Sequence, residues 1–376
     1  MLWLVITLIL LLPYVVLLLL YRYWWGQQKP LQVPAAFQPN TRFSIVVPAR
    51  NEAHNLPACL ASIAALDYPY ELYEVIVVDD CSHDTTAAVA ASYPGVRVLR
   101  MQELPPVEGV AFKKQALSAG IAVATGIYIV TTDADCVVPA GWLRQFAHII
   151  ETKTDVQLIA APVAMRHESN FIQLFQSLDF LSLQGITAAS VQAGVHSMCN
   201  GANLCYSRAA FYNVGGFAGI DHIASGDDML LMHKIYSAHA ASVHYAFSRD
   251  SIVQTEPVQT VREFLLQRIR WASKATAYTD RRIFWVLLLL YLVNLWLPLL
   301  LLAGLLQQEA AVVFAGALLV KTIAELYFLI PVTRFFGKQP LLAWFPLLQP
   351  HHILYTLIAG WLGTWGKYEW KGRMVR

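Results

Sequence analysis

Charged residues are scarce in this chain, and neither sign dominates. Asp, Glu, Lys and Arg make up 14% of the 376 residues, with 27 basic against 25 acidic side chains. Proteins that bind nucleic acid carry clustered positive charge, so this balance argues against a nucleic-acid partner. Apolar residues reach 57%, which is too many for a purely soluble chain. We therefore expect a globular domain joined to membrane helices.

Cysteines are also few, and none shows the paired C-x-x-C spacing of a zinc site. We expect all five to be small buried residues in a reducing, cytoplasmic part of the protein, where disulfides are rare. They are Cys59, Cys81, Cys136, Cys199 and Cys205. No repeat or long Gly/Ser linker is evident, so the globular domain should lie close to the bilayer.

The first 21 residues carry no charge and are long enough to cross a bilayer core of about 30 Å. The basic residues Arg22 and Lys29 follow this run, the reverse of the order in a cleaved signal peptide. The pattern predicts an N-terminal transmembrane anchor over 1–21 and a juxtamembrane linker over 22–42.

Residues 276–376 form the predicted C-terminal membrane region, with transmembrane helices at about 283–306 and 310–333. Within the second helix, Lys321 and Glu325 stand four residues apart, and we expect them to pair because isolated charges are costly in a membrane.

The last apolar stretch, 341–365, contains several prolines and histidines and is followed by Lys367 and Lys371. A broken or re-entrant element is favoured there, with a fourth crossing as the alternative. Basic residues border the segment 22–282, which indicates a cytoplasmic domain of an integral membrane protein in a bacterial-type inner or plasma membrane.

Short apolar runs alternate with helical patterns between residues 43 and 160. This alternation predicts an α/β domain over 43–275, with a mostly parallel, Rossmann-like sheet and helices on both faces. The expected strands are 43–47, 75–78, 96–99, 127–131 and 157–161; the expected helices lie near 53–66, 84–92, 111–124 and 139–151.

Polar clusters follow three of these strands, namely 48–52, Asp79-Asp80 and Asp133-Ala134-Asp135. Each cluster alone is typical of a solvated loop or a helix cap. Ligands bind beyond the carboxyl ends of parallel strands, so three clusters at that edge predict a binding site. Asp133 and Asp135 have the spacing to share Mg²⁺ or Mn²⁺.

Two pairs of residues fit a nucleotide at this edge. Asp79 and Asp80 are placed to accept hydrogen bonds from a base or ribose. Lys113 and Lys114 are placed to bind a diphosphate, and the alternative for them is a solvated surface position.

Two further motifs come later in the chain. Asp227 and Asp228 precede a helical pattern, where an aspartate serves either as a helix cap or as a general base. Gln267, Arg270 and Trp271 share one helix face just before the membrane hairpin, where the alternative is a helix lying at the membrane interface.

In their order along the chain, these motifs resemble those of the membrane-bound branch of the family 2 inverting glycosyltransferases. The motifs are Pro48-Ala49-Arg50-Asn51-Glu52, Asp79-Asp80, Asp133-Ala134-Asp135, Gly226-Asp227-Asp228 and Gln267-x-x-Arg270-Trp271. The resemblance covers roughly residues 43 to 275 and extends to polysaccharide synthases and ceramide-type glucosyltransferases. It implies a GT-A fold, a UDP-sugar donor and a lipid or glycan acceptor.

The resemblance also implies roles for individual residues. Asp228 would be the general base beside Asp227, which stands where the family usually has Glu, and Asp133 and Asp135 would hold the metal. The donor-binding residues implied by the resemblance are Pro48, Arg50, Glu52, Asp79, Asp80, Asp133, Gln267, Arg270 and Trp271. Lys113 and Lys114 complete the predicted donor site. Asn200, Gly201 and Trp271 would lie on the acceptor side.

The acceptor stays open at this point. Single transfer to a lipid is slightly favoured over a processive polysaccharide synthase, because few membrane elements are available for a polymer channel, although partner subunits would supply more. A nucleotidyltransferase and an inactive scaffold subunit are the alternatives of another class.

Overall fold

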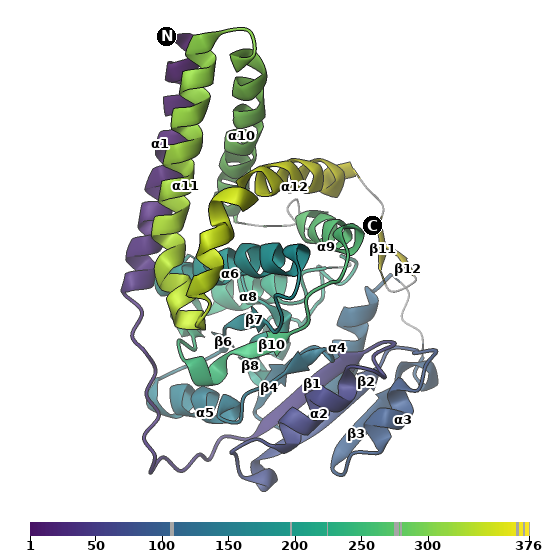
Figure 1. The fold of residues 1–376 in the computed structure, drawn as a ribbon. Coiled ribbons are helices and arrows are strands. Elements are labelled where there is room, and N and C mark those ends of the chain that lie inside the picture. The colour runs from purple at the N-terminus through teal and green to yellow at the C-terminus, as the bar shows by residue number, and fades with distance from the viewer. Residues whose placement is uncertain are drawn as a thin grey trace. The chain divides into compact units, whose positions relative to one another are not determined.

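The computed structural model describes residues 1–105, 109–195, 198–223, 225–273, 278, 280–365, 368–370 and 373–375. Lys367 and Lys371 lie outside the described residues, as does the expected boundary at 275–276. The chain forms two compact units (Figure 1). The sheet unit comprises Gln28–His167, Ser190–Pro257 and Glu369–Arg376; the helical unit comprises Met1–Gln27, Glu168–Ala189 and Val258–Tyr368.

The sheet unit is built on a seven-stranded sheet with the order β3-β2-β1-β4-β8-β6-β9. Its strands are β1 (Phe43–Ala49), β2 (Tyr73–Asp79), β3 (Val96–Arg100), β4 (Tyr128–Thr131), β6 (Leu158–Ala160), β8 (Leu204–Ser207) and β9 (Val243–Tyr245). All neighbours pair in parallel except β8, which is antiparallel to both β4 and β6. The predicted mostly parallel sheet is therefore confirmed.

A second sheet has the order β5-β10-β7, with β5 at Cys136–Val137, β7 at Val163–Met165 and β10 at Val253–Thr255. Two short strands near the C-terminus, β11 (Tyr368–Trp370) and β12 (Arg373–Val375), pair with each other.

The central strand β1 is buried on both faces. Ile45, Val46 and Val47 are each 0% exposed, and successive strand residues point to opposite faces. Both faces of the sheet are therefore covered at β1, as the unbroken apolar run predicts.

Helices follow most strands of the sheet unit. They are α2 (Leu56–Ala64), α3 (Thr86–Ala91), α4 (Phe112–Val123), α5 (Trp142–Thr152), α7 (Arg208–Asn213) and α8 (Met229–Ala238). Short 3₁₀ turns lie at η1 (Tyr70–Leu72), η2 (Met101–Glu103), η3 (Gly201–Asn203), η4 (Ala240–Ser242) and η5 (Arg249–Ser251). Helix α4 packs directly on β1 and β2. Gly120 permits this approach, because a Cβ there would lie 2.6 Å from Cγ1 of Val46.

The helical unit contains α1 (Leu2–Gly26), α6 (Phe171–Gln192, up to Ala189), α9 (Val261–Ala272), α10 (Arg281–Gly304), α11 (Gln308–Phe336), η7 (Gln339–Trp344) and α12 (Phe345–Trp365). Helices α1, α10 and α11 pack against one another (Figure 1). Within the described residues, these three are long and apolar enough to cross a membrane.

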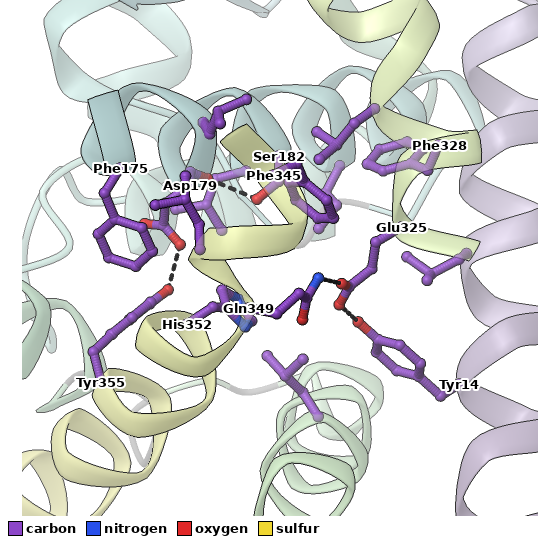
Figure 2. Close-up of a pocket in the computed structure, with 17 residues that line it drawn as sticks. Tyr14, Phe175, Asp179, Ser182, Glu325, Phe328, Phe345, Gln349, His352 and Tyr355 are labelled. Carbon is purple, nitrogen blue, oxygen red and sulfur yellow. Dashed lines mark hydrogen bonds between the residues drawn. The ribbon is translucent and has the colours of Figure 1, made fainter. Parts of the chain in front are cut away.

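Polar side chains are buried inside the helical unit. Nζ of Lys321 lies 2.7 Å from Oε1 of Glu325, which confirms the predicted pair, and it donates to Oε1 of Gln349 at 2.7 Å. Tyr14 and Gln349 both donate to the Glu325 carboxylate. A cavity of about 120 Å³, lined mainly by apolar side chains of the helical unit, lies beside this cluster (Figure 2).

The structure divides the predicted domain 43–275 differently from the prediction. Glu168–Ala189 and the residues from Val258 group with the helical unit, because α6, α9 and α12 share a core of Phe175, Leu178, Phe264 and Leu348. The region 341–365, predicted to be broken, is a 3₁₀ turn followed by one continuous helix. Pro346 falls in the first turn of that helix, where proline costs little, and α12 continues through Pro350. Its relation to a membrane stays a prediction.

Candidate active site

The carboxyl ends of β1, β2 and β4 meet at one edge of the sheet. Ala49 pairs with Asp79 across β1 and β2, and Val46 pairs with Thr131 across β1 and β4. The polar clusters that follow these strands therefore begin side by side, although they are far apart in the chain.

Arg50 ties the loop after β1 to the loop after β2. Its side chain is buried, and its Nη1 donates to the carbonyl oxygens of Asp80 at 2.7 Å and Cys81 at 2.9 Å. Asn51 and Cys81 both have φ of 52°, a left-handed conformation that non-glycine residues seldom adopt. Backbone strain of this kind persists only where the surroundings hold it.

Further hydrogen bonds join the same two loops. The N–H of Asn51 donates to Oγ of Ser82 at 3.0 Å, and the N–H of Glu52 donates to Oγ1 of Thr86 at 2.8 Å. In return, the N–H of His83 donates to Oδ1 of Asn51 at 2.9 Å. The pair of loops is thus a preformed structure.

The aspartates at the end of β2 are held within this structure. Asp79 is 2% exposed and Asp80 is 6% exposed. Oδ1 of Asp79 accepts from the N–H of Ser82 at 3.4 Å, and the N–H of Asp80 donates to the carbonyl oxygen of Ala49 at 2.8 Å. Glu52 accepts from Nδ2 of Asn55 at 2.8 Å. Pro48 lies within β1, opposite Val78.

Lys113 joins two acidic motifs. Its Nζ lies 2.7 Å from Oδ1 of Asp133, after β4, and 3.3 Å from Oδ2 of Asp227, before α8. Burial disfavours the charged ammonium, but the negative charges of Asp133, Asp227 and Asp228 outweigh this effect and raise the pKa of Lys113. Lys113 is therefore a fixed positive charge among carboxylates.

Asp228 is held at the start of α8. Its Oδ1 accepts from the N–H of Met229 at 2.6 Å, and its Oδ2 accepts from the N–H of Gly201 at 3.1 Å. Gly201 also fits closely beside its neighbour, because a Cβ there would lie 3.2 Å from Oδ2 of Asp227. The carboxylate thus caps the helix, and its orientation is fixed from two sides.

The remaining acidic residue of this edge lies beside two thiols. Sγ of Cys136 donates to Oδ1 of Asp135 at 3.5 Å. Burial, followed by the charges of Asp135 and Asp133, raises the pKa of Cys59. The same causes raise the pKa of Cys136, so both thiols are neutral at physiological pH. All five cysteines are free; four are buried as predicted, whereas Cys81 is only partly buried.

Lys114 is used differently from the sequence prediction. It is 1% exposed, and its Nζ donates to the carbonyl oxygens of Ile220 at 2.6 Å, Ile223 at 2.7 Å and Ser225 at 3.0 Å. An ammonium has three N–H donors, so these bonds engage all of them. This geometry favours a structural role, holding the loop before Asp227, over the predicted binding of a diphosphate.

Two further residues of this edge were not singled out by the sequence. Oγ1 of Thr131 donates to the carbonyl oxygen of Gly201 at 2.8 Å, and Oδ1 of Asn203 accepts from Nε1 of Trp142 at 2.8 Å. Asn203 belongs to the segment 200–203, in which the sequence assigns only Asn200 and Gly201 to the acceptor side. Asn200 itself caps η3 by accepting from the N–H of Ala202 at 3.0 Å.

Gln267, Arg270 and Trp271 belong to the helical unit, on α9. The helix begins with a capping box between Thr260 and Glu263, a local signal that fixes its start. All three side chains of the motif are partly exposed.

The chain is similar to known glycosyltransferases. Residues 44–215 match the family Glycosyl transferase family 2. Glycosyltransferase AglE of Haloferax volcanii is 26% identical over 231 residues, which cover 60% of this chain and 70% of AglE. The poly-beta-1,6-N-acetyl-D-glucosamine synthase of Staphylococcus epidermidis is 24% identical over 258 residues, which cover 67% of this chain but only 60% of that synthase.

Among solved structures, mannosyltransferase PcManGT from Pyrobaculum calidifontis, determined with GDP-Man and Mn²⁺, is similar with a TM-score of 0.60. The similarity covers 96% of this chain and 99% of PcManGT at 21% identity, a level that establishes the fold. Residues 44–215 thus match family 2 glycosyltransferases, and the chain has the GT-A fold.

Proposed function

We propose that this protein transfers a sugar from a nucleoside diphosphate donor to a hydroxyl group of a membrane-linked acceptor. The observation that carries the proposal is the cluster of Asp133, Lys113, Asp227 and Asp228, drawn from three separate parts of the chain. Asp133 follows β4 and Asp79 ends β2, the two strands that flank β1, so this cluster lies at the same edge of the sheet as Asp79 and Asp80.

In this proposal the loops after β1 and β2 bind the nucleoside. The carboxylates of Asp79 and Asp80 would accept hydrogen bonds from the base or ribose. Arg50 and the hydrogen bonds between the two loops fix their positions before the donor arrives, which lowers the ordering cost of binding.

Asp133 and Asp135 are the proposed ligands of a divalent cation, Mg²⁺ or Mn²⁺. Their oxygens have the right chemistry, but no group of three His, Cys, Asp or Glu side chains within the described residues is arranged to hold a metal. This fits a cation held by one or two carboxylates together with donor phosphates, the usual arrangement for Mg²⁺. When bound, such a cation stabilises the charge that develops on the leaving diphosphate.

Asp228 is the proposed general base. Its two oxygens accept the backbone N–H groups of Met229 and Gly201, which fix the orientation of the carboxylate. An acceptor hydroxyl would donate its proton to Asp228 as its oxygen attacks the anomeric carbon, and the glycosidic bond to the diphosphate would break. This single displacement inverts the anomeric configuration.

Lys113 forms ion pairs with the carboxylates of Asp133 and Asp227. Because its ammonium already neutralises part of their charge, it would also limit repulsion when the anionic donor enters. Gln267, Arg270 and Trp271 are proposed to contact the donor diphosphate and the acceptor from α9, and Asn200 and Gly201 to lie on the acceptor side.

The identity of the base in the donor and the acceptor class are further parts of the proposal. UDP-sugars are the first expectation, and GDP-sugars are the second because PcManGT binds GDP-Man. A lipid acceptor is favoured by three helices able to cross a membrane. A processive synthase is the second candidate, supported by the likeness to the poly-beta-1,6-N-acetyl-D-glucosamine synthase.

The test is transfer by the full-length protein in lipid nanodiscs, with UDP- and GDP-sugars supplied separately along with Mg²⁺ or Mn²⁺. We expect release of one nucleoside diphosphate and a product bearing a single sugar. Asp228→Asn should abolish transfer, whereas Asp67→Asn, at a side chain that is 73% exposed, should not. A polymeric product would identify a processive synthase in place of single transfer to a lipid. Full transfer by Asp228→Asn would disprove the role of Asp228 as the general base.

A further inference from the structure

Arg268 is a buried arginine within the segment Gln267–Trp271, and the proposed function gives it no role. Its side chain is 4% exposed, whereas Arg262 on the same helix is exposed. A buried charge is costly unless its surroundings compensate it. We therefore expect neighbouring side chains to compensate the charge of Arg268.

The guanidinium of Arg268 contacts four side chains. Nη2 lies 2.6 Å from Oδ2 of Asp179, and Nη1 donates to Oε1 of Gln267 at 2.9 Å. Its carbon Cζ stands 4.2 Å from the ring centroid of Trp271 and 4.7 Å from that of Phe264. A planar guanidinium can stack on rings and form hydrogen bonds together, which a lysine ammonium cannot reproduce.

Asp179 links this contact to two other helices of the helical unit. Asp179 lies on α6, with its side chain 2% exposed, and accepts a hydrogen bond from the hydroxyl of Tyr355 on α12 (Figure 2). The ring of Tyr355 packs edge-on against that of Phe264, with centroids 5.2 Å apart. Arg268 thus adds polar contacts to the apolar core that joins α9 to α6 and α12.

The contacts fix two residues of the motif. Because Oε1 of Gln267 accepts from Nη1 of Arg268, the orientation of the Gln267 side-chain amide is set. The indole of Trp271 is held by the guanidinium on one side and by Phe180, whose ring centroid is 6.2 Å away.

We propose that Arg268 is a positioning residue for the transfer reaction. It does not touch the substrate; it orients Gln267 and Trp271 and anchors them to α6 and α12 through Asp179. The inference rests on the proposed function, since the roles of Gln267 and Trp271 belong to that proposal.

The test must separate positioning from stability. Removing Arg268 alone would leave the Asp179 carboxylate buried and unpaired, so the polar groups are removed together in Arg268→Met/Asp179→Leu/Tyr355→Phe. Replacement of a buried ion pair by apolar side chains of similar volume is often tolerated. Arg262→Met is the matched control on the exposed face of α9.

Three measurements are made on each protein in nanodiscs: thermal unfolding, nucleoside diphosphate binding and sugar transfer. A fourth is the fluorescence of Trp271, obtained as the difference from the same protein carrying Trp271→Phe. We expect the triple variant to unfold near the parent temperature and to bind the nucleoside diphosphate more weakly, because Gln267 and Trp271 are proposed to contact the diphosphate. Its kcat should fall at least about tenfold, and the fluorescence of Trp271 should change. The kcat of Arg268→Lys should also fall, because lysine keeps the positive charge but cannot stack on the rings of Trp271 and Phe264.

The outcomes distinguish the two claims. A folded triple variant with the kcat of the parent would overturn the positioning role and leave the proposed function intact, and so would full activity in Arg268→Lys. A triple variant that fails to fold, together with a fully active Arg268→Lys, would assign Arg268 to stability alone. If the parent protein transferred no sugar to any acceptor, the proposed function would be disproved. The positioning role of Arg268 would then be disproved as well, whatever the fluorescence of Trp271 shows.

Discussion

The ammonium of Lys113 lies 2.7 Å from Oδ1 of Asp133, although the two residues belong to different helix and strand segments of the sheet unit. The same ammonium reaches Asp227 at 3.3 Å. One lysine thus joins the strand-end motif to the motif before α8. Both acidic motifs depend on its charge, and this dependence can be tested.

Replacing Lys113 by glutamine should weaken transfer and alter metal binding. The carboxylates of Asp133 and Asp227 would lose their shared counter-charge, so the affinity for Mn²⁺ without nucleotide should rise. Transfer should fall by about tenfold, corresponding to about 1.4 kcal/mol in the barrier. Calorimetric titration with Mn²⁺ and initial rates of transfer measure the two effects. Lys153→Gln, at an exposed lysine, is the control; equal Mn²⁺ affinity in the parent and in Lys113→Gln would contradict the account.

The pH dependence of stability follows from the same contact. The pKa of Lys113 is raised because the charges of Asp133 and Asp227 outweigh its burial. A raised folded-state pKa gives stability that is complete below the unfolded value, about 10.4, and is lost only as pH rises through the folded value. The difference in unfolding free energy between the parent and Lys113→Gln should therefore stay constant from pH 6 to pH 9. Chemical denaturation across this range measures it, and a difference that declines within the range would refute the assignment.

Much of the sheet edge could be predicted because its signals are local. Runs such as 43–47 and 75–78 are apolar enough to be strands buried on both faces, and the parallel order brings the residues that follow them to one edge. Asp79 and Asp133 could be placed there without coordinates. The capping position of Asp228 was likewise an open alternative in the sequence, and the structure shows the cap.

The difference between Lys113 and Lys114 could not be predicted. Adjacent residues on a helix point about 100° apart, but the sequence does not say which direction faces the interior. That depends on the loop of Ile220 to Ser225, more than 100 residues later, whose carbonyl oxygens receive Lys114. The grouping of α9 with the helical unit could not be predicted either, because it depends on distant contacts such as that between Arg268 and Asp179.

Replacing Lys114 by methionine should destabilise the sheet unit. The change removes three hydrogen bonds from a fully buried ammonium and leaves the carbonyl oxygens of Ile220, Ile223 and Ser225 without this donor. Buried groups that lose their partners cost about 1–3 kcal/mol each, so we expect a loss of at least about 3 kcal/mol. Chemical denaturation measures this loss. If Lys114→Met were as stable as the parent but could no longer bind nucleotide, the predicted role in donor binding would be restored.

A methyl group at Gly201 should disturb the chemistry more than the fold. In Gly201→Ala the new Cβ would lie 3.2 Å from Oδ2 of Asp227, so that carboxylate or the Gly201 backbone must shift by a few tenths of an ångström, whereas the 3.6 Å to Cβ of Asp228 is an ordinary contact. The N–H of Gly201 also holds Oδ2 of Asp228, and a displaced general base loses alignment with the acceptor hydroxyl.

We therefore expect kcat of Gly201→Ala to fall by about tenfold to a hundredfold, with a loss of unfolding free energy near 1 kcal/mol. Gly316→Ala is the matched control, because a Cβ at that helical position meets nothing within 4 Å and alanine favours a helix over glycine. Transfer rates and denaturation of both variants make the comparison. Equal kcat in Gly201→Ala and the parent would mean that the close fit of Gly201 beside Asp227 does not limit the reaction.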